Sequence, residues 1–60
     1  MIKGTWLKDA YGDWVFIIVD RIILVEKEKE SNIYTIIFAD DIRRRFRDTE
    51  IQKIFRKEED

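Results

Sequence analysis

Large apolar side chains recur along the chain in runs of about four to six residues, a length typical of β-strands. Isoleucine alone occurs eleven times, and β-branched residues pack well on a pleated sheet. Turn-forming residues separate the runs, among them Gly12, Asp20-Arg21 and Ser31-Asn32. The pattern predicts five strands, at about residues 2–7, 14–19, 22–29, 33–39 and 42–47.

The period of the apolar positions changes near the C-terminus. Ile51, Ile54 and Phe55 stand at positions i, i+3 and i+4, which form one stripe along a helix. Thr49-Glu50-Ile51-Gln52 fits the capping-box pattern, in which a hydroxyl residue and a Glu or Gln three positions later satisfy the first helical N–H groups. We therefore expect one helix at about residues 49–57.

Five short strands followed by one helix indicate a mainly β (α+β) fold. We expect a single domain over residues 1–60, built as a small five-stranded antiparallel barrel or bent sheet of the size of an SH3 domain. The C-terminal helix would close one open end. A chain of 60 residues buries only about 60% of its unfolded surface, and this chain has no cysteine for a disulfide and no histidine for a zinc site.

The predicted strands carry apolar residues on both faces, whereas a sheet with one wet face alternates apolar and polar positions. Trp14–Val19, Ile22–Val25 and Ile36–Phe38 are all uninterrupted. Exposed apolar patches beyond a few hundred Å² are rare on soluble monomers, so two explanations are open. Either a second copy covers the outer face, which makes the protein a homo-oligomer, or tight barrel closure buries both faces. We expect the charged run Glu26–Glu30 to be a solvated arm.

The composition argues against catalysis. Without histidine and cysteine, the favoured general base and the thiol nucleophile are both absent, and the two glycines do not form a phosphate-binding loop. The carboxylate pair Asp40-Asp41 follows an apolar run and is typical of a solvated turn. We therefore expect no enzymatic activity, no metal site and no cofactor.

The longest apolar run has six residues, against the roughly 20 that cross a bilayer. The first residues, Met1–Thr5, show no apolar segment or small-residue cleavage site of a signal peptide. We expect a cytoplasmic protein without a membrane partner.

The net charge of −1 conceals an uneven distribution. Between positions 43 and 57, seven basic residues face two acidic ones, which gives this segment a charge of +5. Its candidate binding residues for nucleic acid or an acidic partner are Arg43, Arg45, Arg47, Lys53, Arg56 and Lys57.

Alternation on the fifth strand places Arg43, Arg45 and Arg47 on one face, about 7 Å apart, close to the phosphate spacing along one nucleic-acid strand. Arg44 falls on the opposite face between apolar neighbours. This implies an edge position, an aliphatic stem that extends the charge into water, or an acidic partner.

Three interpretations of the arginine face stay open. The face can bind DNA or RNA phosphates, with Tyr11, Trp14 and Tyr34 as candidate stacking residues for unpaired bases. It can instead pair with an acidic protein surface in a homo-oligomeric structural or protein-interaction module. It can also be a solvated edge that keeps an isoleucine-rich chain in solution. Three arginines on one strand face exceed what solubility needs, so we place nucleic acid slightly ahead.

Overall fold

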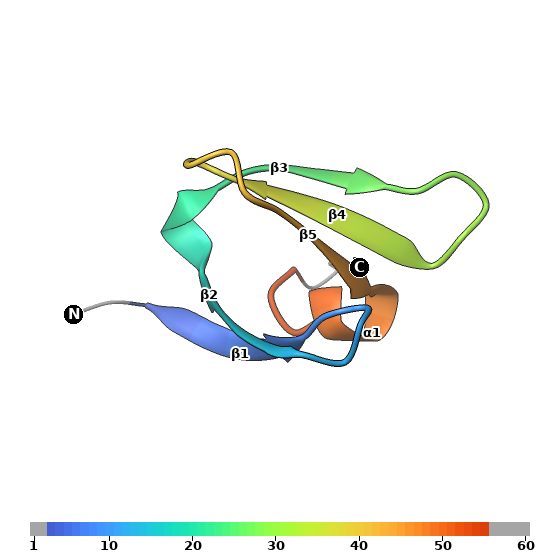
Figure 1. Cartoon of the computed structure of the whole chain (residues 1–60), viewed down its shortest axis with the longest axis horizontal. Coiled ribbons are helices and arrows are strands. Elements are labelled where there is room, and N and C mark those ends of the chain that lie inside the picture. Colours follow the sequence, from blue (N-terminus) through green and yellow to red (C-terminus); the bar gives the residue numbers. More distant parts are fainter. Residues whose placement is uncertain (1–2, 56–60) are drawn as a thin grey trace, which may run out of the picture.

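The computed structural model describes residues 3–55, which form five strands and one short C-terminal helix in the predicted order (Figure 1). Each strand begins and ends within two residues of the range that the sequence indicates. The strands are β1 (Gly4–Lys8), β2 (Trp14–Ile18), β3 (Ile22–Lys27), β4 (Ile33–Phe38) and β5 (Arg43–Arg47). A 3-10 helix, η1 (Val19–Arg21), connects β2 to β3, and α1 (Asp48–Ile51) follows β5.

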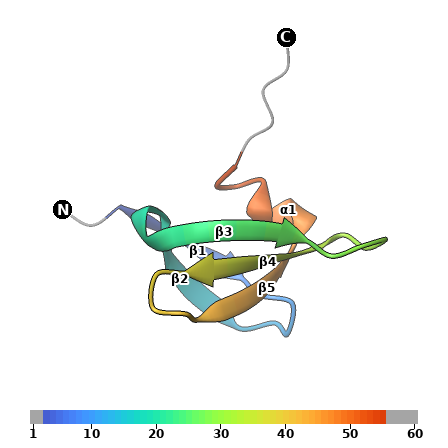
Figure 2. The ribbon, with the colours of Figure 1, turned by 90° about the horizontal axis from the view of Figure 1, so that it is seen from above.

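The strands form two antiparallel sheets. β1 pairs with β2, and β4 lies between β3 and β5 in a three-stranded sheet that Figure 2 shows in front of the hairpin. Among residues 3–55 the two sheets share one isolated bridge, from Asp9 to Phe46, and no ladder joins β2 to β3. The mainly β fold is thus confirmed, but the described residues do not close into a five-stranded barrel. The barrel stays open because η1 carries the chain from the first sheet into the second, so that β2 and β3 do not pair as neighbouring strands.

The core lies between the facing sheets. Alternate residues of β1, β2, β4 and β5 point inward, whereas a register shift between Ile22 and Leu24 interrupts the alternation on β3. α1 packs against β1, β4 and β5 at one end of the core (Figure 1). The fully or almost fully buried apolar side chains are Leu7, Ile17, Ile36, Phe46 and Ile51. Ile54 packs against this cluster, as the helical stripe predicts, whereas Phe55 is exposed.

The helix is shorter than the sequence predicts. It ends at Ile51, and the chain continues in turns where the N–H groups of Lys53 and Ile54 donate to the carbonyl groups three residues earlier. Such i→i+3 bonds tighten the end of a helix and stop its propagation. Residues 56 and 57, the end of the predicted helix, lie outside the described residues.

The predicted capping box is wrong. The N-cap residue is Arg47, and its side chain makes no capping hydrogen bond. The Glu50 carboxylate instead accepts the backbone N–H of Lys8 at 3.0 Å, which connects α1 to the end of β1. This bond, assisted by Lys53 Nζ at 3.2 Å, lowers the pKa of Glu50. A tertiary hydrogen bond, and not a capping box, therefore holds the first turn of α1.

The two sheets leave many large apolar side chains on the surface, so the strands are not buried on both faces. The exposed ones are Trp6, Tyr11, Trp14, Phe16, Val19, Ile23, Leu24, Ile42 and Phe55. Within residues 3–55 no helix has the length and hydrophobicity needed to cross a membrane.

Candidate nucleic-acid interface

The arginine row lies on the outer face of the three-stranded sheet. Arg43, Arg45 and Arg47 stand opposite β4 residues of the outward-facing set, while Phe46 between them is fully buried in the core. Arg43 and Arg47 are exposed. The alternation predicted from sequence therefore holds in the structure.

Arg45 differs from its two neighbours because an acidic residue of the same chain binds it. Its Nε donates to Glu28 Oε2 at 2.6 Å and its Nη2 donates to Glu28 Oε1 at 3.0 Å, a bidentate pair. Nη1 also donates to the Tyr11 hydroxyl at 3.4 Å. The Glu28 bonds, and then the Tyr11 bond, raise the pKa of Arg45 above its already high ordinary value. Glu28 thus belongs to the site, although the sequence indicates a solvated arm there.

Arg44 occupies the inner face, opposite the buried Ile36, yet it is exposed. β5 has only β4 as a ladder partner among the described residues, so Arg44 lies on a sheet edge, one of the environments expected for it. It borders an open cleft together with Phe38, Asp40 and Ile42.

The other predicted cations contribute less. Lys53 forms an ion pair with Glu50 at 3.2 Å and is half-exposed. Arg56 and Lys57 lie outside the described residues.

The three candidate stacking residues lie in different places. Tyr11 is 74% exposed and lies beside Arg45. Trp14 is also exposed, but on the outer face of the β1–β2 hairpin. Tyr34 lies on the inner face opposite Phe46, is partly buried and packs against the core, so it does not belong to the arginine face.

The loop that carries Tyr11 is held by a buried carboxylate. Asp9 is only 6% exposed, and its Oδ1 accepts the backbone N–H groups of Tyr11 and Asp13, both at 2.9 Å. Gly12 adopts a φ of 93°, the left-handed conformation expected of it in this turn. The loop therefore presents Tyr11 from a defined backbone.

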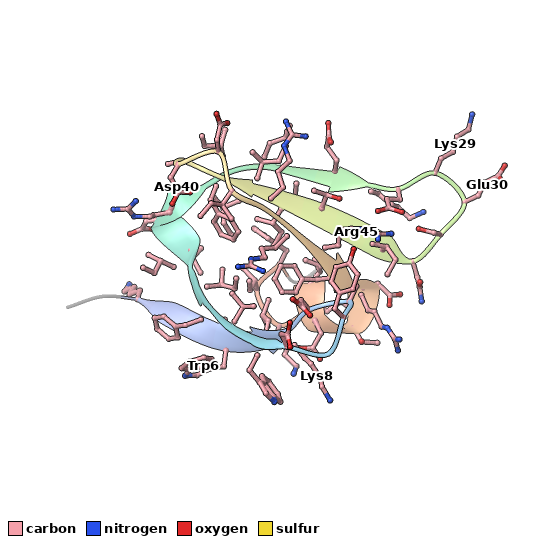
Figure 3. The ribbon with its side chains drawn as sticks, in the orientation of Figure 1. Trp6, Lys8, Lys29, Glu30, Asp40 and Arg45 are labelled. Atoms are coloured by element: carbon pink, nitrogen blue, oxygen red, sulfur yellow. The ribbon has the colours of Figure 1, made fainter. Side chains whose placement is uncertain are left out.

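Sequence reasoning missed Trp6, Phe16 and Lys8. Trp6 stands opposite Phe16, and Lys8 stands opposite Trp14, all on the hairpin's outer face. Figure 3 shows Trp6 and Lys8 pointing away from the three-stranded sheet. Alternation divides each hairpin strand into two faces, but both faces carry large apolar side chains, so the sequence alone does not show which face points outward.

The bridge between Asp9 and Phe46 joins the hairpin face to the arginine row. An antiparallel bridge at these residues makes Lys8 the neighbour of Arg47 across the strands. One surface hollow is lined by Lys8, Tyr11 and Arg47. A second hollow, which shares Tyr11 with the first, is lined by Arg43. The resulting surface, here called the basic–aromatic band, comprises Trp6, Lys8, Tyr11, Trp14, Phe16, Arg43 and Arg47.

Among residues 3–55 no three carboxylates lie together in a group able to hold a metal ion. Asp40 and Asp41 are exposed in the β4–β5 turn, where Asp41 has a φ of 69°. Comparison of the chain with protein-family models, with curated proteins and with solved structures gave no match.

Proposed function

We propose that the chain is a non-enzymatic nucleic-acid-binding module that contacts the phosphate backbone through the basic–aromatic band. The observation that carries the proposal is the meeting of Lys8 and Arg47 at the bridge between the sheets. Arg43 extends this row along β5. Within residues 3–55 no ion pair occupies any of these three cations, so all three are free to bind phosphate.

The physical chemistry of such contacts defines the expected behaviour. Each phosphate contact releases counterions, so the logarithm of affinity falls with the logarithm of salt concentration by about 0.7 per contact on single strands and about 0.9 on duplexes. Contacts between cations and phosphate carry no sequence information. The module should therefore bind nucleic acid with little sequence preference. We place this activity in the cytoplasm, because a chain without cysteine needs no disulfide.

The test is the fluorescence anisotropy of labelled 20-nucleotide DNA, RNA and duplex DNA, titrated with protein at several salt concentrations. Arg43→Gln and Arg47→Gln should each reduce the salt slope on single strands by about 0.7. Arg21→Gln removes the same charge from an exposed position in η1 outside the band and should leave the slope unchanged. Absence of binding to all three ligands at 20 mM salt would refute the proposal.

A second candidate function is self-association as a structural or protein-interaction module. The open cleft beside β2 has the apolar residues Ile17, Phe38 and Ile42 in its lining and both Arg44 and Asp40 at its margin. Opposite charges at one margin can pair reciprocally across a two-fold axis, so that Arg44 of one copy meets Asp40 of the other. A light-scattering mass of one chain at 100 µM would count against this candidate. A dimer that Arg44→Glu dissociates would support it.

A further inference from the structure

We propose that the outer face of the β1–β2 hairpin is a stacking platform for the unpaired bases of single-stranded nucleic acid. This inference rests on the proposed function and names its ligand class. Trp6, Phe16 and Trp14 are 58%, 42% and 60% exposed, and the rings of Trp6 and Phe16 lie 5.3 Å apart at an angle of 58°. Exposed aromatic rings of this kind stack any base, because every base has a π-face.

The platform is built into the backbone of the hairpin. A Cβ atom on Gly4 would lie 2.6 Å from the Phe16 ring and 2.6 Å from the Ile17 carbonyl oxygen. The ring of Phe16 therefore occupies the space that a side chain at position 4 would fill. The absence of a side chain at Gly4 lets Phe16 extend across β1 toward Trp6, its cross-strand partner.

The charges on this face suit a polyanion. Lys8 is the charged residue among the outward-facing residues of β1 and β2, and its Nζ lies 5.9 Å from the centre of the Trp14 ring. Arg47 lies beside Lys8 at the bridge between Asp9 and Phe46 and adds a second positive charge. A strand whose bases stack on the aromatic residues would thus find cations for its phosphates along the same path.

The area of the face favours a nucleic acid over a second copy of the chain. Three aromatic side chains of about 200 Å² each, roughly half exposed, offer about 300 Å² of contact surface. A stable protein interface needs about 800 Å² from each partner. Stacked bases need no such area, because one base on one aromatic ring contributes a measurable part of the affinity. Duplex DNA hides its base faces, so the platform selects single strands.

Tryptophan fluorescence tests the inference directly, because both tryptophans of the chain lie on the platform. The protein is titrated with a (dT)12 oligonucleotide, with a 12-mer of the same backbone whose sites are abasic, and with a 12-base-pair duplex. We expect (dT)12 to quench the fluorescence and to bind at least fivefold more tightly than the abasic strand. Trp6→Ala and Trp14→Ala should each weaken (dT)12 binding by about 5- to 150-fold. Trp6→Phe retains an aromatic ring and should restore most of the affinity.

Circular dichroism of each variant establishes that the fold persists. Equal affinity for (dT)12 and the abasic strand would overturn the stacking platform and leave phosphate binding intact. Absence of binding to any of the three ligands would overturn the proposed function as well. The protein alone, without oligonucleotide, is also diluted in series. If its tryptophan fluorescence is quenched at higher protein concentration and its light-scattering mass doubles, a second copy covers the face and the inference is overturned.

Discussion

Glu28→Gln should strengthen nucleic-acid binding, because it frees an arginine that the wild-type chain neutralises. In the structure the Glu28 carboxylate holds Arg45 through two hydrogen bonds, of 2.6 and 3.0 Å, while Arg43 and Arg47 on the same strand face are exposed. With Lys8, Arg43 and Arg47 as phosphate contacts, the salt slope on single strands is about −2.1. A fourth contact from Arg45 changes it to about −2.8. If the two affinities agree at 1 M salt, the variant binds about fivefold more tightly at 0.1 M.

The assay is the anisotropy of a labelled single strand between 0.05 and 0.3 M salt. Glu30→Gln is the matched control, since it removes the same charge at the tip of the β3–β4 hairpin, away from Arg45 (Figure 3). An unchanged slope for Glu28→Gln, or an equal gain for Glu30→Gln, would refute the assignment of Arg45 as a masked phosphate contact.

Three further predictions concern the framework that presents the site. Ile36→Val removes one buried methylene and should lower the free energy of unfolding by about 1 kcal/mol in urea denaturation, against a total of about 3–9 kcal/mol for 60 residues. Glu50 has a lowered pKa in the folded chain, so its stabilisation is complete above the ordinary glutamate pKa of 4.5 and is lost as pH falls through the lower folded value. Thermal melts from pH 7 to 3 should therefore show a smaller decrease for Glu50→Gln than for wild type. Gly4→Val should displace the Phe16 ring, lower stability by about 1–3 kcal/mol and weaken (dT)12 binding; unchanged (dT)12 affinity would contradict the role of Gly4.

The local features of this fold can be predicted from the sequence because they depend on neighbouring residues. Short apolar runs of β-branched residues, separated by polar turns, give the strands, and a two-residue period gives the faces of β5. Gly12 in its turn follows from the same local chemistry. The length of the helix and its tertiary contact do not follow from local chemistry: the helix ends at Ile51 in i→i+3 turns, and the Glu50 carboxylate binds the N–H of Lys8, 42 residues away in the chain.

The partners within the site depend on strand register, which alternation alone does not determine. Glu28 follows the end of β3, and its side chain contacts Arg45 on β5 across the intervening β4, where Thr35 stands opposite Arg45. Trp6 could not be distinguished from core residues, because the hairpin strands are apolar on both faces. Tyr34 was a candidate for stacking, but its pairing with Phe46 places it on the inner face.

The most direct test of nucleic-acid binding is the affinity of the wild-type chain for a labelled (dT)20 strand at two salt concentrations. With three phosphate contacts, the affinity should fall about 20-fold between 50 and 200 mM salt. An affinity that does not change over this range, or no binding at 50 mM with protein at 100 µM, would contradict the function proposed for this protein.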